Sequence, residues 1–289
     1  MPVAPRRPAV LRGRVFRGSD VVAAGTLSPG ELRSPAWRRL FRDVYACVDL
    51  PVTHHLRAVA AAGLVVPGSV VTGRSAAVLW GLPAAERDDD VELTVPPRST
   101  VCRVAGITVR RRLLDPAAVT VRRGTPVTTA EVTAVDLART GPLDEAVVLI
   151  DRLVAGRLTN LEMVRAVEVT GRGCRQVREA VALADGLAGS PQETRLRLLL
   201  HRSGLPRPIA QFTVRDAGGF VARVDFAWPE VKVAVEYEGL WHGETPQQVA
   251  ADRRRLNRLR EAGWTVVFVT AEDLHRPERL VARIAAALA

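Results

Sequence analysis

Residues 231–238 constrain the fold of this chain more than any other stretch. They read Val-Lys-Val-Ala-Val-Glu-Tyr-Glu, so that an apolar or aromatic side chain recurs at every second position. A period of two is typical of a β-strand that buries one of its faces. The opposite face then carries two acids in line, Glu236 and Glu238. The sequence therefore predicts a strand that presents a pair of carboxylates beside a packed sheet.

A second alternating stretch lies just upstream, at residues 223–228. Its large apolar residues share one predicted face: Val224, Phe226 and Trp228. Asp225 falls on the opposite face, and pairing of the two strands would place it beside Glu236. We expect the carboxylates of Asp225, Glu236 and Glu238 to lie within about 8 Å of one another at one edge of a sheet.

Carboxylates gathered in this way repel one another unless a proton or a cation lies between them. Ligands that offer only oxygen suit Mg²⁺ or Mn²⁺, which hold a water molecule and polarise phosphoryl oxygens. The pattern thus favours a divalent-metal site beside a phosphodiester. A polar strand face exposed to water would give the same spacing, so spacing alone leaves both interpretations open.

Two predicted helices flank these strands. The first opens at Ser190 with Pro in its first turn and Glu193 three residues after the cap, which reads as a capping box. Capping accounts for Glu193, yet the same side chain is in line with the leucines that follow and can lean toward the acids. The second helix starts near Pro246. Its Asp252 lies in an apolar stripe, so it needs a partner such as Arg255, a backbone donor or the acidic site.

Short stretches between residues 190 and 280 match one known family in their order: Ser190-Pro-Gln-Glu-Thr-Arg, Gly204-Leu-Pro, Gln211, Arg223-Val-Asp-Phe-Ala-Trp-Pro, Val235-Glu-Tyr-Glu-Gly, His242, Asp252-Arg-Arg-Arg, Gly263-Trp and Val269-Thr-Ala-Glu-Asp-Leu. They resemble the small nuclease-like domains related to the very-short-patch repair endonuclease, within the PD-(D/E)XK superfamily. The resemblance implies a mixed sheet flanked by helices. It also implies Asp225 and Glu236 as ligands of Mg²⁺ or Mn²⁺, with Glu193 as the acid from a helix.

One departure from the superfamily pattern concerns catalysis. The Lys that normally follows the second acid by two residues is Glu238 here. Its part in activating water would pass to a metal-bound water, His242 or Arg255. A turn could carry His242 over the carboxylates as a general acid, although packing beside Trp241 explains it equally. The other histidines have no paired ligands and read as surface residues: His54, His55, His201 and His275.

Basic residues concentrate at the N-terminus. Residues 1–57 contain ten Arg against four acids, a net charge of +6 out of +10 for the whole chain. Three short helices are predicted there, starting at Ser19, Ser28 and Ser34, and a strand follows at 44–48. This order is typical of a winged helix-turn-helix, whose third helix would offer three arginines to DNA: Arg38, Arg39 and Arg42. A three-helix cap with solvated arginines would read similarly.

Further stretches are shared with a second family: Arg42-Asp-Val-Tyr-Ala, Val71-Thr-Gly-Arg-Ser-Ala-Ala, Trp80-Gly-Leu-Pro, Val91-Glu-Leu-Thr-Val-Pro, Gly106-Ile-Thr-Val-Arg-Arg-Arg, Pro126-Val-Thr-Thr and Val135-Asp-Leu-Ala-Arg. Residues 14–140 thereby resemble the N-terminal part of AbiEi-like antitoxins and related transcriptional regulators. The resemblance implies DNA binding by the first 50 residues and a small mixed α/β unit after them. Strand patterns at 91–95 and 101–112, the second with a turn at Ala105-Gly106, agree with such a unit. Helices are expected over 129–140, 143–155, 159–169 and 173–186.

Length and composition bound the organisation. A chain of 289 residues can hold more than one domain. We expect a DNA-binding segment, an α/β and helical region, and, after a linker at 186–189, a nuclease-like domain: 1–50, 51–186 and 190–289. The three cysteines are far apart and form neither a zinc cluster nor a disulfide framework, which favours a reducing cytoplasm. No apolar stretch reaches the roughly 20 residues of a membrane span.

The sequence as a whole predicts an α/β protein of the bacterial cytoplasm, with a winged-helix-like segment, a small α/β region and a restriction-endonuclease-like mixed sheet flanked by helices. Its predicted function is Mg²⁺- or Mn²⁺-dependent hydrolysis of DNA, with RNA as a second candidate substrate. The residues assigned to catalysis are Asp225, Glu236, Glu238, Glu193, His242 and Arg255. The alternative is a non-enzymatic DNA-binding regulator or type IV antitoxin with a degenerate nuclease fold, acting with a toxin partner encoded nearby.

Overall fold

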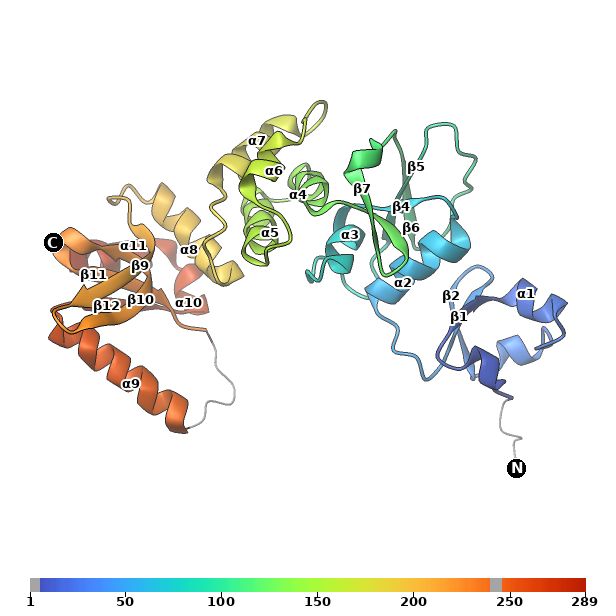
Figure 1. Ribbon diagram of the computed structural model, residues 1–289, viewed down its shortest axis with the longest axis horizontal. Helices are drawn as coiled ribbons and strands as arrows, with labels where there is room; N and C mark the ends of the chain where they lie inside the picture. Colours follow the sequence, from blue (N-terminus) through green and yellow to red (C-terminus); the bar gives the residue numbers. More distant parts are fainter. Residues whose placement is uncertain (1–5, 240–245) are drawn as a thin grey trace. The chain divides into compact units, whose positions relative to one another are not determined.

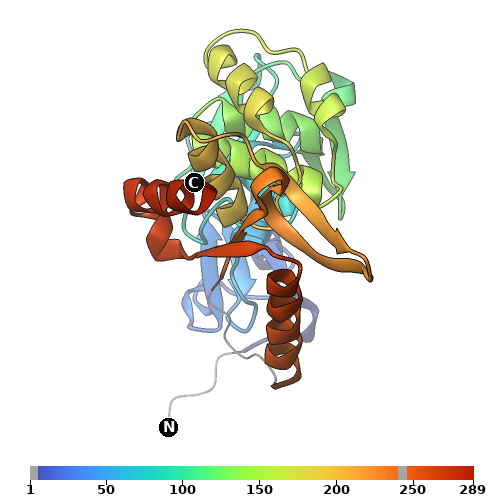
Figure 2. The same cartoon turned by 90° about the vertical axis from the view of Figure 1, so that its left-hand side faces the viewer.

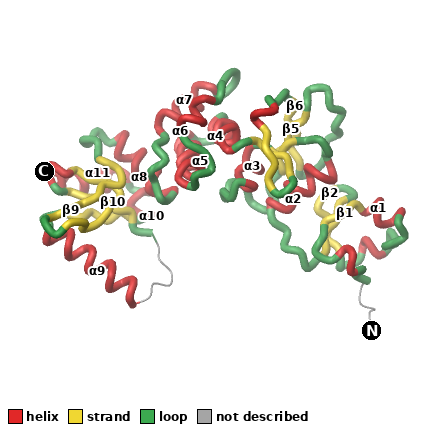
Figure 3. The backbone as a smooth tube through the Cα atoms, viewed as in Figure 1, coloured by secondary structure: helices red, strands yellow, loops and turns green. Residues whose placement is uncertain are grey.

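The computed structural model describes residues 6–239 and 246–289 (Figure 1). Contacts within the chain divide it into two compact units. The first runs to Thr140 and includes Ala166–Glu168, and the second comprises Gly141–Arg165 and Val169–Ala289. Each unit combines helices with a β-sheet, as the colouring by secondary structure shows (Figure 3). The predicted α/β class is therefore confirmed.

The first unit begins with a small antiparallel sheet of three strands in the order β1-β3-β2. The strands are β1 (Val15–Arg17), β2 (Trp37–Phe41) and β3 (Val44–Cys47). Between β1 and β2 the chain forms α1 (Gly18–Ala23) and a 3-10 turn (Glu31–Arg33), and another 3-10 turn (Ala9–Leu11) precedes β1. These elements enclose a core of their own: Leu11, Phe16, Val21, Leu27, Leu32, Ala36, Trp37 and Cys47.

The third helix predicted to start at Ser34 is wrong, because residues 37–41 form the strand β2. Trp37 and Phe41 are both buried, and they are four residues apart. A spacing of four suits one face of a helix and equally one face of a regular strand, so the pattern did not separate the two. In β2 a register shift between Arg39 and Phe41 lets Trp37 and Phe41 pack in different cores. Pairing with β3 decides for the strand. The helical turn predicted after Ser28 and the strand at 44–48 are confirmed.

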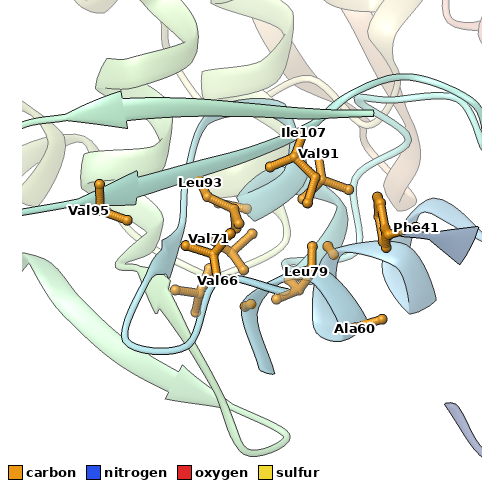
Figure 4. Packing of buried hydrophobic residues seen from close by; sticks show 14 of the residues in the cluster. Phe41, Ala60, Val66, Val71, Leu79, Val91, Leu93, Val95 and Ile107 are labelled. Carbon is orange, nitrogen blue, oxygen red and sulfur yellow. The ribbon is translucent and has the colours of Figure 1, made fainter. Parts of the chain in front are cut away.

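A five-stranded sheet in the order β6-β5-β4-β8-β7 forms the rest of the first unit. Its strands are β4 (Val70–Val71), β5 (Val91–Val95), β6 (Ile107–Arg111), β7 (Val119–Arg122) and β8 (Thr125–Thr128). A short 3-10 turn precedes β7, at Pro116–Ala118. The helices are α2 (His54–Ala60), which continues as a π-turn (Ala61–Val65), α3 (Gly73–Leu79) and α4 (Ala130–Ala138). Side chains of β4, β5 and β6 meet those of α2 and α3 in the core (Figure 4). The expected strand at 91–95 is confirmed. In the stretch 101–112, the predicted turn at Ala105-Gly106 and the strand after it are confirmed, whereas the part before the turn forms only an isolated bridge at Val104.

His54 corrects the prediction that it lies at the surface. It is only 3% exposed. Its Nδ1 lies 3.0 Å from the carbonyl oxygen of Glu86, and its Nε2 lies 2.8 Å from the hydroxyl of Ser75. Burial lowers the pKa of the imidazole, which favours the neutral ring that such a hydrogen-bonded position requires.

The second unit consists of a helical layer followed by a four-stranded sheet in the order β12-β11-β10-β9. The first helices are α5 (Leu143–Ala155), α6 (Leu161–Ala166), α7 (Cys174–Leu183) and α8 (Pro191–Arg202). The strands are β9 (Ile209–Asp216), β10 (Gly219–Trp228), β11 (Val233–Tyr237) and β12 (Thr265–Val269), with a 3-10 turn at Pro229–Val231. The last helices are α9 (Pro246–Glu261), α10 (Ala271–Leu274) and α11 (Pro277–Leu288). The helices predicted over 129–140, 143–155, 159–169 and 173–186 are thus confirmed, with shorter bounds.

The segment 186–189, expected as a linker, is fixed by hydrogen bonds to the helices around it. Asp151 of α5 is only 1% exposed, and its carboxylate accepts the backbone N–H of Gly186 at 2.8 Å. The same carboxylate accepts the hydroxyl of Thr194 at 2.9 Å and Nη2 of Arg197 at 2.8 Å, both from α8. A buried carboxylate with this many donors is compensated for its lost hydration. Helices α5 and α8 are therefore joined in one unit.

Candidate active site

The sheet of the second unit has a hydrophobic core on each face. One core lies against α8 and α11: Leu196, Leu200, Phe226, Trp228, Val233, Val235, Val267, Val269, Leu280 and Ile284. The other lies against α9: Val214, Val221, Ala222, Val224, Ala227, Ala234, Leu259 and Trp264. Figures 1 and 2 show α9 on one side of the sheet, with α8 and α11 on the other. Side chains at the end of β11 therefore lie between helices that approach from both sides.

Strand β10 reverses its alternation at Asp225. Val224 packs in the core against α9, whereas Phe226 packs in the core against α8 and α11. A regular strand would place both on one face, as the sequence predicted, and that prediction is wrong. On the neighbouring strand β9, Gln211 has a left-handed backbone with φ of 52°. The register pairs the residues on either side of Asp225 and Gln211 but not these two residues, so the irregularity in both strands falls at one point.

This irregular point carries a set of linked polar side chains. Asp225 accepts the backbone N–H of Tyr237 through Oδ2 at 2.8 Å, which places its carboxylate at the end of β11. The side-chain nitrogen of Gln211 lies 3.4 Å from Oδ1 of Asp225 and 3.2 Å from Oε2 of Glu193. Gln211 therefore bridges an acid from β10 and an acid from α8.

Glu193 lies at the start of α8 and also contacts the acidic site, but the predicted capping box is only half formed, because its carboxylate accepts the N–H of Gly189 and not that of Ser190. Its backbone N–H donates to the hydroxyl of Ser190 at 3.2 Å, as the first turn of α8 requires. Its carboxylate accepts the N–H of Gly189 at 2.8 Å as well as the amide of Gln211. The side chain of Glu193 therefore accepts a backbone N–H just before α8 and, through Gln211, is linked to Asp225 of the sheet.

Glu236 is buried, with 7% exposure, and is neutralised by Arg255 of α9. The two guanidinium nitrogens donate to the two carboxylate oxygens at 2.6 and 2.8 Å, a bidentate pair. This hydrogen-bonded carboxylate raises the pKa of Arg255. Arg255 also pairs with Asp252 at 3.1 Å, so the partner predicted for Asp252 is confirmed. Asp252 itself is exposed, which corrects its prediction as part of a buried stripe.

Asp225 differs from Glu236 because none of the ion pairs found in residues 6–239 and 246–289 involves it. Burial raises the pKa of Asp225 to about 6, and the negative charges of Glu193 and Glu236 act in the same direction. The donors from Tyr237 and Gln211 oppose this rise. The acids of α8 and β11 therefore both act on Asp225 of β10, and among the described residues only Glu236 of the three has a cationic partner.

In the part of the chain that it describes, the structure does not link the remaining predicted residues to the acidic site. Glu238 is exposed, and its backbone N–H donates to the carbonyl of Val269 at 2.7 Å. No hydrogen bond joins its carboxylate to another residue of the described chain, so its grouping with Asp225 stays a prediction. His242 lies outside the described residues. Across the part of the chain that is described, no three His, Cys, Asp or Glu side chains form a group that could hold a metal ion.

Sequence reasoning assigned no role to Gln211, although the residue stands in the matched stretches. A single amide in a strand gives no periodic signal, and its neighbours in the site come from positions 193 and 225. Its position could have indicated its role: in an antiparallel hairpin with a short turn, Gln211 falls opposite Asp225 on the neighbouring strand.

The arginines predicted to bind DNA are exposed, but on a different element. Arg38 and Arg39 lie on β2, and Arg42 lies in the turn between β2 and β3. They were expected on a helix, and the formation of β2 corrects this. None of the three forms an ion pair within the described part of the chain. Their charges are therefore available to a partner.

No family model matches the chain. Two relatives are the uncharacterized proteins Rv2248 and MT2308, from the H37Rv and CDC 1551 strains of Mycobacterium tuberculosis. Each is 40% identical over 158 residues, which make up 53% of this chain and 58% of the relative. The chain thus matches little more than half the length of these relatives. The crystal structure of the RV2827C protein from M. tuberculosis has a TM-score of 0.42 and 18% identity, covering 70% of this chain and 83% of that one.

No helix in the described ranges is both long enough and apolar enough to cross a bilayer.

Proposed function

We propose that the second unit is a metal-dependent nuclease that hydrolyses phosphodiester bonds in DNA, and that the N-terminal sheet helps to bind the DNA. The observation that carries the proposal is the bridging of Glu193 and Asp225 by Gln211 at an irregular point of two strands, with the charge of Glu236 also acting on Asp225. Structural acids are usually placed where a cation or several donors compensate them. Asp225 is partly buried and has no cationic partner among the described residues, although two other acids raise its pKa.

The acidic side chains fit a divalent cation in their chemistry. All of their ligand atoms are oxygens, and Asp225 is a partly buried acid with no cationic partner among the described residues. Asp225 and Glu193 would hold Mg²⁺ or Mn²⁺, and Glu236 would join them when Arg255 releases part of its carboxylate. A bound ion would supply a Lewis acid that polarises a phosphoryl oxygen and lowers the pKa of a water molecule.

The protein side chains have separable tasks in this proposal. Gln211 orients Asp225 and Glu193 relative to each other through its amide. Arg255 holds Glu236 and brings a permanent positive charge next to the place where a phosphate would lie. Glu238, which stands where the superfamily has Lys, and His242 are proposed to take part in proton transfer.

DNA binding by the N-terminal sheet is proposed from its strand order and charge. A winged helix places short helices between its first and second strands and uses the turn between the second and third strands as a wing. The order β1-β3-β2, with α1 between β1 and β2, agrees with that arrangement. Arg38, Arg39 and Arg42 would then contact phosphates from the wing and not from a recognition helix.

A second candidate function is a DNA-binding regulator or antitoxin in which the nuclease fold has lost turnover. The ion pair between Arg255 and Glu236 favours it, because this pair neutralises the most buried acid of the site without a metal. Glu238 in place of Lys favours it as well. In this case the second unit would bind nucleic acid or a toxin partner without cleaving.

The test is a cleavage series on duplex, nicked and single-stranded DNA and on RNA, with Mg²⁺, Mn²⁺ or Ca²⁺. We expect the wild type to cleave at least one DNA form with Mg²⁺ or Mn²⁺. Asp225→Asn should reduce the rate about 100-fold or more, since loss of a metal ligand removes several kcal/mol of charge stabilisation. The exposed Glu230 gives the matched control Glu230→Gln. No cleavage by the wild type on any substrate would favour the regulator, and equal rates for wild type and Asp225→Asn would refute the mechanism.

A further inference from the structure

Helix α9 carries a group of basic side chains that the acidic site does not use. Its inner side is marked by the buried Leu259 and by Arg255, which is turned toward Glu236. At about 100° per residue, the opposite side of the helix is a continuous exposed face. This outer face carries Arg253, Arg254, Asn257, Arg258 and Glu261, with Arg260 at its margin, all exposed.

The arginines of this outer face lack acidic partners. Arg253, Arg254, Arg258 and Arg260 form no ion pair with any residue that the structure describes. The nearest acid earlier in the helix, Asp252, is already bound to Arg255. Four arginines against the single Glu261 leave a net charge of +3 on the outer face. An unbalanced charge of this size on one helix face attracts a polyanion.

One arginine of this face also holds α9 to the sheet. The guanidinium of Arg258 donates to the carbonyl oxygen of Phe220 in β10, which ties the end of the β9–β10 hairpin to α9. Arg215 of β9 is exposed and pairs in register with Phe220, but it follows Val214, which packs in the core against α9. Strand alternation therefore directs Arg215 to the other face of the sheet, and the basic face is confined to α9.

We propose that the outer face of α9 binds the phosphate backbone of a nucleic acid. The proposal rests on the proposed function in that nucleic acid is the partner, and it adds a binding surface distinct from the N-terminal arginines. Arg254 and Arg258 are one helical turn apart, about 6 Å along the axis, so each can contact a different phosphate. A lipid surface fits less well, because a membrane-binding helix needs an exposed apolar face and α9 turns its leucines to the sheet.

The test is the salt dependence of binding by the full chain. A labelled 20-base-pair DNA duplex and a 20-nucleotide single strand are titrated in EDTA, so that binding is measured without cleavage. The variant is Arg253→Gln with Arg254→Gln, two exposed positions without described partners. The control changes the same charge elsewhere in the unit, at two exposed arginines: Arg175→Gln with Arg279→Gln. Each pair is also made with Arg38, Arg39 and Arg42 reversed to Glu, so that the N-terminal arginines do not mask the effect.

We expect the α9 variant to bind about tenfold more weakly or worse at 0.1 M salt, with the slope of log K against log salt smaller by about 2 for the duplex. The control should keep the wild-type affinity and slope. Equal values for the α9 variant and the control would overturn the proposal, as would undetectable binding by the wild type at 50 mM salt. Loss of binding to phosphatidylserine vesicles with unchanged nucleic-acid binding would assign the surface to lipid instead. Because binding is measured in EDTA, the proposal for α9 can hold even if the protein is not a nuclease. Conversely, DNA cleavage together with unchanged binding by the α9 variant would support the proposed function and refute the proposal for α9.

Discussion

Replacing Asp225 by Asn should stabilise the second unit at neutral pH. In the folded protein the pKa of Asp225 is raised from 3.8 to about 6, mainly by burial and further by Glu193 and Glu236. The ionised carboxylate is therefore unfavourable in the fold. Each pKa unit corresponds to about 1.4 kcal/mol, so ionisation costs at most about 3 kcal/mol, and less where solvent screens the partly buried group. Asn keeps an acceptor for the N–H of Tyr237 and removes the charge.

The sign of the pH dependence follows from the same shift. Between pH 3.8 and about 6 the folded state binds more protons at Asp225 than the unfolded state does. The contribution of this group to stability is thus fully present below pH 3.8 and is lost as the pH rises through about 6. The free energy of unfolding of Asp225→Asn, minus that of the wild type, should grow by about 1–3 kcal/mol from pH 4 to pH 8.

The assay is urea denaturation followed by tryptophan fluorescence at pH 4, 5, 6, 7 and 8. Trp228 and Trp264 report on the second unit, since both are buried in its cores. Glu230→Gln, at an exposed position, controls for the loss of one negative charge. A destabilised Asp225→Asn at pH 8, or a difference from wild type that does not change with pH, would refute the reasoning.

A metal arm tests the ligand role on the same samples. If Asp225 holds Mg²⁺, saturating Mg²⁺ should stabilise the wild type at pH 8, by about 2.7 kcal/mol at a concentration 100 times the dissociation constant. EDTA should remove this gain. Asp225→Asn should gain much less, since it lacks the charged ligand. Equal gains in both proteins would place the ion elsewhere.

Three further perturbations test other parts of the structure. Arg255→Gln should destabilise the second unit by about 2–4 kcal/mol in urea at pH 7, because Glu236 stays buried without its cation; the double variant with Glu236→Gln should recover part of this loss, and an additive loss would contradict the pairing. Gly73→Ala should cost about 2–4 kcal/mol by thermal unfolding, since φ is +57° and the new Cβ would lie 2.1 Å from Glu92 Oε2. Gly124→Ala, at φ +78° in open space, should show only the smaller backbone cost. Reversing Arg38, Arg39 and Arg42 to Glu should weaken DNA binding and reduce the slope of its salt dependence. Unchanged affinity and slope would remove the wing arginines from the proposal.

Much of the second unit is determined by local sequence. The alternation at 231–238 and the β-branched residues within it predict β11, although the strand begins only at Val233, after a 3-10 turn and the left-handed Lys232. Both faces of β11 are buried, whereas the sequence predicted one buried face. Ser190 followed by Pro specifies the start of α8, because the cap and the fixed φ of Pro act within a single turn. The place of Asp225 beside the end of β11 also follows from antiparallel pairing of neighbouring strands.

Tertiary structure decided the features that depend on partners distant in the chain. The reversed alternation at Asp225 arises together with the left-handed backbone of Gln211, and no periodic pattern encodes a single residue of this kind. Arg255 selects Glu236 as its partner only because α9 packs on that face of the sheet. Trp37 and Phe41 would suit a helix as well as a strand, and pairing with β3 chose the strand. In each case contacts between elements determine the conformation, and the local spacing of residues does not encode those contacts.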